Sequence, residues 1–158
     1  MDMIEQLNVF VDTLHPVVQV LAVLVIGIVP FLESYVGAGI GVVAGMPVVL
    51  AVGAAVIGNL IALAAAVWLG DRARRGITKG GAKPQSDRRR KLLARVDRYG
   101  VPIASLAAPT LMAISITPFA MVAAGLNRQQ VIIWQAITVV VWGVAFGALA
   151  LGALSALG

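Results

Sequence analysis

The chain has 158 residues, of which 60% are apolar and only 12% are charged. Its mean hydropathy is +0.97, whereas an ordinary soluble domain carries about 25% charged residues. This composition excludes a soluble globular domain, a disordered tail and a nucleic-acid-binding module, and it predicts an integral membrane protein of one domain. The absence of cysteine from the sequence excludes disulfides, thiolate metal ligands and thiol catalysis.

Residues 1–16 are predicted to form a short amphipathic helix that lies in the membrane interface. Its apolar residues recur at helical spacing over residues 3–14, with polar residues between them. We expect no signal peptide, because acidic residues stand where basic ones should be. The apolar residues of this helix are Ile4, Leu7, Phe10, Val11 and Leu14.

Residues 17–70 form a first apolar block whose one charged residue is Glu33. A membrane-spanning helix needs about 20 residues, so the block is too long for two simple spans and too short for three. Pro30 and a run of glycines interrupt residues 17–46, for which we therefore expect a re-entrant helical hairpin. Residues 47–69 follow as one full span.

Residues 71–100 form a polar loop that contains eleven of the twelve basic residues and three acids, for a local net charge of +8. A basic loop between apolar blocks is typical of the cytoplasmic side of a membrane. Nucleic acid is not expected as a partner, because the loop matches no nucleic-acid-binding module. Its second part predicts a basic amphipathic helix, with Ser86 as N-cap and Gly100 as C-terminal stop. The residues expected to contact anionic lipid headgroups are Arg88, Arg89, Arg90 and Lys91.

Residues 101–158 form a second apolar block that resembles the first. Prolines interrupt this block up to residue 126. We expect a polar turn at residues 127–130 and a full span over residues 131–157. Pro30 and Pro109 stand 79 positions apart, and Gly45 and Gly125 stand 80 apart. The spacing predicts two related halves, with hairpin breaks at Pro30, Pro109 and Pro118. Paired broken segments are the best sequence indication of a transporter site, and they must face each other or water.

Glu33 is the candidate coupling residue. A carboxylate inside an apolar run costs roughly 2.5 kcal/mol or more in membrane insertion, which indicates a function or a partner. As a coupling or substrate-contacting group, it would be kept partly neutral by desolvation. Alternatively, residues 17–32 form a first span and Glu33 only reaches water at its end.

Gly37, Gly41 and Gly45 are spaced by four residues, which predicts close packing between helices; a surface for substrate approach is the alternative. Gly143 and Gly147 repeat the spacing in the last span.

Asn59 and Gln135 are single amides within the two full spans. We expect each either to bind a neighbouring helix or broken backbone, or to line a polar transport cavity.

The sequence contains no catalytic set and no cluster of metal ligands, because it has one histidine and the spans hold one acid. We therefore expect neither an enzyme nor a cofactor.

Several short motifs resemble the small multidrug export protein family, which is similar to the wider DedA-like superfamily. The resemblance covers residues 29–142. The motifs are Pro30-Phe31-Leu32-Glu33-Ser34-Tyr35, Gly45-Met46-Pro47, Gly58-Asn59, Arg98-Tyr99-Gly100-Val101-Pro102, Ala124-Gly125-Leu126-Asn127-Arg128 and Trp134-Gln135.

The resemblance implies a multi-pass protein of the bacterial inner membrane with two re-entrant hairpins. DedA-like proteins are associated with proton-dependent transport and lipid-carrier flipping, and Glu33 matches the acidic residue of their first hairpin. This chain departs from them in one respect: they carry arginines around the second hairpin's proline, and residues 107–113 contain none. Recognition of a phosphate headgroup is therefore not implied.

The sequence thus predicts an all-α polytopic membrane protein with two broken hairpins and two full spans, arranged as an inverted repeat. The expected function is a transporter or flippase of an amphipathic substrate, a lipid carrier or a drug-like molecule, coupled to protons. The alternative is a non-transporting subunit that packs against a larger membrane complex through its glycine faces. The bilayer and anionic headgroups are the expected partners, together with a second copy of the chain or such a complex.

The orientation of the chain in the membrane can be tested by chemical labelling. Because the natural chain lacks cysteine, single cysteines at residues 2, 80 and 158 can be labelled from one side of the membrane. Residue 80 should react only from the cytoplasmic side, owing to the excess of Lys and Arg around it. Both termini should lie outside if residues 17–46 return to their starting side, and inside if residues 17–32 cross. Labelling of residue 80 from outside would refute the assignment.

Overall fold

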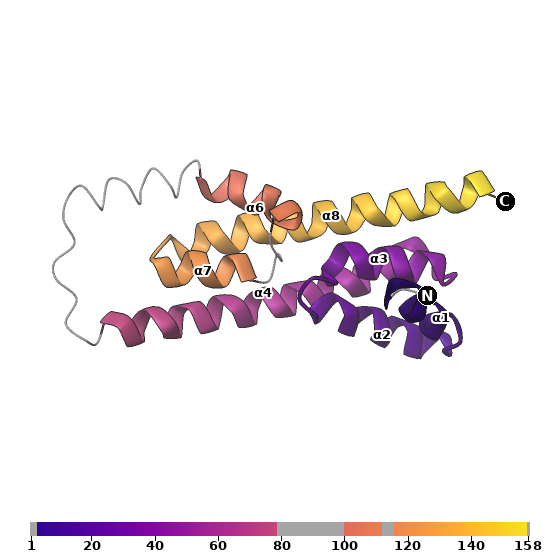
Figure 1. Cartoon of the computed structure of the whole chain (residues 1–158), viewed down its shortest axis with the longest axis horizontal. Coiled ribbons are helices and arrows are strands. Elements are labelled where there is room, and N and C mark those ends of the chain that lie inside the picture. The colour runs from indigo at the N-terminus through magenta and orange to yellow at the C-terminus, as the bar shows by residue number, and fades with distance from the viewer. Residues whose placement is uncertain (1–2, 79–99, 112–115, 158) are drawn as a thin grey trace. The chain divides into compact units, whose positions relative to one another are not determined.

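The computed structural model describes residues 3–78, 100–111 and 116–157, and every regular element in these residues is a helix (Figure 1). The predicted all-helical class is confirmed. Two helices, α4 (Val48–Thr78) and α8 (Arg128–Leu157), are long and apolar enough to cross a membrane. The basic helix expected before Gly100 falls outside the described residues. The shorter helices are α1 (Met3–Asp12), α2 (Pro16–Ile28), α3 (Glu33–Val43), α6 (Val101–Leu111) and α7 (Ile116–Ala124).

The chain divides into two compact units. The first combines Met1–Ala62 with Val139–Gly158, and the second is Leu63–Thr138. The first unit therefore contains α1, α2, α3, the N-terminal half of α4 and the C-terminal part of α8. The second contains the rest of α4, α6, α7 and the start of α8.

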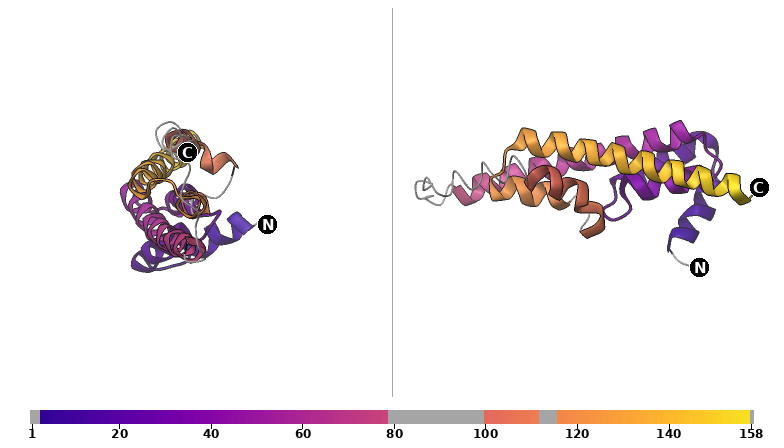
Figure 2. Two further views of the ribbon diagram at one scale, coloured as in Figure 1. Left: turned by 90° about the vertical axis from the view of Figure 1, so that its left-hand side faces the viewer. Right: turned by 90° about the horizontal axis from the view of Figure 1, so that it is seen from above.

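The predicted N-terminal helix is present as α1, which packs against α2 and α3 in the first unit. Val11 is fully buried in the core of this unit, while Ile4 and Phe10 are exposed. The Gln19 Nε2 donates a hydrogen bond of 3.1 Å to the Val11 carbonyl oxygen, which ties α2 to the end of α1. Figure 2 shows α1 crossing the direction of the other helices of this unit.

The predicted interruption at Pro30 is present, because α2 ends at Ile28 and α3 begins at Glu33. The two helices then pack against each other in antiparallel directions. A Cβ atom at Gly37 would lie 3.4 Å from both the Ile26 Cγ2 and the Val23 carbonyl oxygen. Residues 16–43 are thus a helix pair joined by a short break.

The backbones of α2 and α4 touch where they cross. A methyl group at Gly58 would overlap the Leu24 carbonyl oxygen, and one at Gly27 would overlap the Ala55 carbonyl oxygen. Only glycine permits such an approach between helix backbones. Gly27 was not among the packing glycines predicted from the sequence.

The predicted packing glycines mostly contact neighbouring helices. Cβ atoms at Gly37 and Gly41 would lie 3.1 Å and 2.8 Å from the Cβ atoms of Ala55 and Ala51 on α4. On α8, Cβ atoms at Gly143 and Gly147 would lie 2.9 Å and 2.5 Å from the Cγ2 atoms of Val56 and Val52, respectively. These contacts show that α4 and α8 run antiparallel within the first unit.

Gly45 departs from the packing prediction, because a Cβ there would meet nothing within 4 Å. Its φ of +80° instead ends α3, and Gly125 ends α7 with a φ of +100°. The residue after each glycine donates to a carbonyl five positions earlier, from Met46 to Gly41 and from Leu126 to Met121. Both are Schellman turns, in which glycine adopts the left-handed conformation without steric penalty.

The helix α4 ends later than predicted, and α8 begins earlier than predicted. The helix α4 continues from the expected span through residues 71–78 of the predicted loop, where Asp71 and Arg75 form an ion pair of 2.6 Å. The Arg72 guanidinium lies 4.3 Å from the centre of the Trp68 ring. At the other long helix, residues 128–130 form the first turn of α8 rather than a loop. The Asn127 Oδ1 caps this turn by accepting from the Gln129 and Gln130 amides.

The prolines of the second block do not all separate helices. Pro102 and Pro118 lie in the first turns of α6 and α7, where a missing amide proton leaves no helical hydrogen bond unmade. Pro109 lies in the last turn of α6. The interval between α6 and α7 lies outside the described residues. In this second unit, a Cβ at Gly70 would lie 2.8 Å from the Phe119 carbonyl oxygen, so α7 packs closely along α4.

Large apolar side chains cover the outside of both long helices. Val49 on α4 is 78% exposed and Leu149 on α8 is 65% exposed. The most apolar stretches of α4 and α8 are only 39% and 22% buried, which differs from the core helix of a soluble protein. Such exposure is expected for surfaces in contact with lipid.

The crossing of α2 and α4 can be tested with two matched substitutions in one helix. Gly58→Ala should lower the melting temperature, because its methyl group collides with α2 backbone; overpacking of this kind costs about 1–3 kcal/mol. Gly53→Ala meets nothing within 4 Å and should be neutral or slightly stabilising. Thermal unfolding of both variants in the same detergent measures the difference. Equal melting temperatures would contradict the close crossing.

Candidate functional site

The break between α2 and α3 positions the candidate site. Pro30 cannot donate a helical hydrogen bond, so the chain leaves the helix at Val29. The Val29 carbonyl oxygen accepts from the amides of Leu32 and Glu33 at 3.2 Å and 3.1 Å. The broken backbone therefore satisfies part of its own hydrogen-bonding capacity, which an apolar environment requires.

Two residues of the break adopt left-handed backbone conformations. Phe31 has φ = +72° and Glu33 has φ = +50°, although neither is glycine. Each such residue costs of order 1–3 kcal/mol, and strain of this kind concentrates at functional sites. The Tyr35 hydroxyl donates to the Phe31 carbonyl oxygen at 3.1 Å and so holds this conformation.

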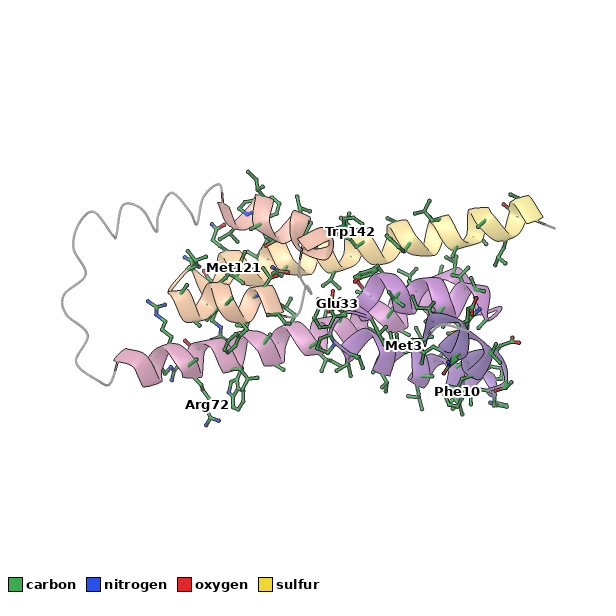
Figure 3. All side chains as sticks on the ribbon, in the orientation of Figure 1. Met3, Phe10, Glu33, Arg72, Met121 and Trp142 are labelled. Atoms are coloured by element: carbon green, nitrogen blue, oxygen red, sulfur yellow. The ribbon has the colours of Figure 1, made fainter. Side chains whose placement is uncertain are left out.

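Glu33 is fully buried at the start of α3 (Figure 3). The next residue, Ser34, is also fully buried. Burial of a carboxyl group in apolar surroundings disfavours its charged form unless it is well paired. The site therefore holds a titratable group that is removed from solvent in the interior of the first unit.

A hydrogen-bond network beside Glu33 joins three helices of the first unit. The Ser34 Oγ donates to the Val139 carbonyl oxygen on α8 at 2.9 Å. The Asn59 Nδ2 on α4 in turn donates to the Ser34 Oγ at 3.2 Å. Gly143 permits this approach, since a Cβ there would lie 3.4 Å from the Ser34 Cβ.

The network leaves one acceptor unused. The Asn59 Oδ1 is buried and accepts no hydrogen bond from any described residue. An unsatisfied buried acceptor costs about 1–3 kcal/mol, so a water molecule or a polar group of a ligand would bind there favourably.

The predicted site residues are only partly brought together. Asn59 contacts Ser34, directly beside Glu33, whereas Gln135 belongs to the second unit. Gln135 is fully buried, and neither atom of its amide group bonds to a described residue. Arg88, Arg89, Arg90 and Lys91 lie outside the described residues.

Ser34 is the residue that the sequence analysis missed. Its position next to Glu33 was the only available signal, because a single serine gives no pattern. Within the described residues, no three His, Asp or Glu side chains gather in a way that could hold a metal ion.

Comparison with known protein families, with curated proteins and with solved structures finds no match for this chain.

The network predicts a specific loss of stability on removal of the Ser34 hydroxyl. Ser34→Ala leaves the Asn59 amide without its acceptor and the Val139 carbonyl without this donor, which should cost about 1–3 kcal/mol. Ser155→Ala is the control, because that hydroxyl bonds to the Gly152 carbonyl at an exposed position. Thermal unfolding of Ser34→Ala, Asn59→Ala and the double variant should give non-additive losses. Additive losses would refute the pairing.

Proposed function

We propose that the chain is a multi-pass membrane protein that moves an amphipathic substrate, a lipid carrier or a drug-like molecule, across the bilayer. The observation that carries this proposal is the burial of Glu33 at the strained break between α2 and α3. An acidic residue inside a membrane segment marks an ion or substrate pathway by default.

The membrane topology in this proposal rests on helix lengths. Both long helices have 29-residue stretches that exceed the roughly 20 residues needed to span a bilayer. The 13 residues of α2 and the 11 residues of α3 are each too short to span, so the pair enters and leaves from one side. Placement of residues 71–100 in the cytoplasm of a bacterial inner membrane belongs to the same proposal.

Two observations support an inverted repeat. The glycine turns at Gly45 and Gly125 have the same hydrogen-bond pattern, and a long helix starts three residues after each. The two long helices also run antiparallel where they meet in the first unit, as halves of opposite orientation would. Inverted repeats place substrate sites at broken helices and allow alternating access.

In this mechanism Glu33 binds a proton when its hairpin is open to one side of the membrane and releases it on the other. In the closed conformation, which excludes water, the neutral carboxyl group can be buried at a low cost in free energy. The charged carboxylate requires water or a polar partner. In the same proposal a donor of the transported group hydrogen-bonds to the Asn59 Oδ1, which accepts no hydrogen bond from any described residue.

The alternative is that the chain is a non-transporting subunit, which requires helix surfaces with exposed glycines that can bind a partner. Gly37, Gly41, Gly143 and Gly147 all face helices of the chain itself, which supports the transporter. Purification discriminates further: a stable monomer or homo-oligomer favours transport, and constant co-purification with a larger complex favours the subunit.

Glu33→Gln tests the proposed coupling, because it preserves size and removes titration. In liposomes with an imposed pH gradient, the wild type should accelerate the movement of a fluorescent phospholipid or of a lipophilic dye. Glu33→Gln should reduce this movement to the rate of protein-free liposomes, while Glu33→Asp should retain part of it. The melting temperature of Glu33→Gln should be unchanged or slightly higher, since a buried carboxylate costs energy.

Asp12→Asn is the matched control, because Asp12 is an exposed acid at the end of α1. It should transport like the wild type. Wild-type transport by Glu33→Gln would exclude proton coupling through Glu33. A combined loss of transport and melting temperature would show instead that Glu33 holds the broken backbone.

A further inference from the structure

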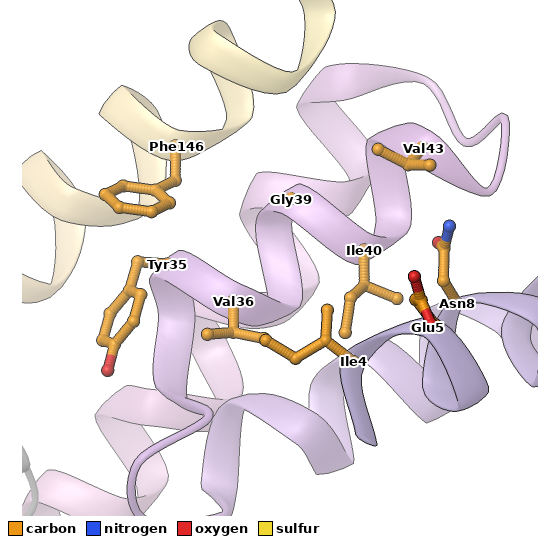
Figure 4. Close-up of a pocket in the computed structure, with 9 residues that line it drawn as sticks. All are labelled: Ile4, Glu5, Asn8, Tyr35, Val36, Gly39, Ile40, Val43 and Phe146. Atoms are coloured by element: carbon orange, nitrogen blue, oxygen red, sulfur yellow. The ribbon is translucent and has the colours of Figure 1, made fainter. Parts of the chain in front are cut away.

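A cavity of about 300 Å³ lies in the first unit between α1, α3 and α8 (Figure 4). Its lining is aliphatic and aromatic apart from Glu5 and Asn8, which both come from α1. A small concave site with apolar walls and a few polar groups at one end is the usual form of a small-molecule site. None of the coupling residues discussed above lines it.

The polar end of this cavity presents hydrogen-bond acceptors. The Asn8 Oδ1 is buried and accepts no hydrogen bond from any described residue. Figure 4 shows the Glu5 carboxylate beside it on the same face of α1. A ligand group that satisfies the amide oxygen must donate a hydrogen bond, and the neighbouring carboxylate favours a donor with positive charge.

Two aromatic rings line the apolar end. Tyr35 and Phe146 meet edge to face, with their centroids 5.4 Å apart. The Tyr35 hydroxyl is already bonded to the Phe31 carbonyl, so the ring is what this residue offers to the cavity. This end suits a hydrocarbon or aromatic body and gives no polar group a partner.

We propose that the cavity binds an amphipathic amine, with its protonated ammonium group at Glu5 and Asn8 and its apolar body against Tyr35 and Phe146. A free lipophilic amine and a lipid with an ethanolamine headgroup share this chemistry. The proposal does not depend on transport, since binding can be measured at equilibrium in a protein whose Glu33 is intact or replaced.

The test compares three probes with one phenylbutyl body in phosphatidylcholine nanodiscs: 4-phenylbutylamine, 4-phenylbutanol and 4-phenylbutyrate. The amount of each probe that partitions into nanodiscs without protein is subtracted from the amount bound in the presence of protein. The amine should bind at least about tenfold more tightly than the alcohol, the difference expected for a charge-assisted hydrogen bond. The carboxylate should not bind, because it would face Glu5.

Gly39 provides a matched pair of blocking variants. It lines the cavity, and a Cβ there would meet nothing within 4 Å, so Gly39→Leu starts a side chain in open space and places its bulk in the cavity. Gly53 has the same freedom but lines a separate apolar hollow between α4 and α8. Gly39→Leu should abolish amine binding and Gly53→Leu should not.

Two further variants change the polar end of the cavity. Asn8→Leu and Glu5→Gln should each weaken amine binding by about five- to tenfold and leave the alcohol unchanged. Melting temperatures confirm that each variant is folded. Equal affinity for amine and alcohol, no binding by any probe, or full binding by Gly39→Leu would overturn the proposal.

A change of lipid distinguishes the two possible natural ligands, a lipid with an ethanolamine headgroup and a free lipophilic amine. Competition by phosphatidylethanolamine in the nanodisc would identify the ligand as a lipid headgroup. Undiminished binding of 4-phenylbutylamine in the same nanodiscs would identify a free amine. Each result supports a site for ammonium groups.

Discussion

The first unit depends on helix backbones that approach closely enough to touch. Gly27 and Gly58 bring α2 against α4, and Gly143 brings α8 against α3. Helices in lipid gain little from the hydrophobic effect, so packing of this kind and hydrogen bonds between helices must hold them together. The close approach also places the Ser34 hydroxyl within 2.9 Å of the Val139 carbonyl oxygen.

The same geometry explains why the polar residues of the site tolerate burial. The break at Pro30 frees backbone groups, and Val29 accepts two of the amides beyond it. The Asn59 amide donates a hydrogen bond to the Ser34 hydroxyl, which in turn donates to the backbone of α8. Three features remain energetically unfavourable: the left-handed Phe31, the left-handed Glu33 and the unused Asn59 oxygen. Such features persist where they serve a function, which is why the proposed mechanism centres on them.

The sequence predicted the fold where single residues have strong local effects. Pro30 ended α2, and long apolar runs formed α4 and α8. Helix ends were less predictable: α4 continues into the expected loop, where Asp71 pairs with Arg75, and Asn127 caps α8 one turn earlier than expected. Polar composition alone does not reveal such pairs.

The site was predictable only in part. Glu33 stood out because a charge in an apolar run is rare, and Asn59 because an amide in a span is rare. Ser34 did not, since its role arises from contacts with residues 25 and 105 positions away in the chain. Gly45 followed the spacing of a packing glycine, yet its backbone conformation gives it a different role.

Glu33 is fully buried, whereas Glu5 and Asp12 are exposed in the described part of the chain. Carboxyl modification followed by peptide mass spectrometry measures this directly, in membranes treated either with the lipid-soluble dicyclohexylcarbodiimide or with a water-soluble carbodiimide and an amine. Glu33 should react with the lipid-soluble reagent and resist the water-soluble one, while Asp12 should show the reverse. Modification of Glu33 by the water-soluble reagent as fast as Asp12 would contradict this burial.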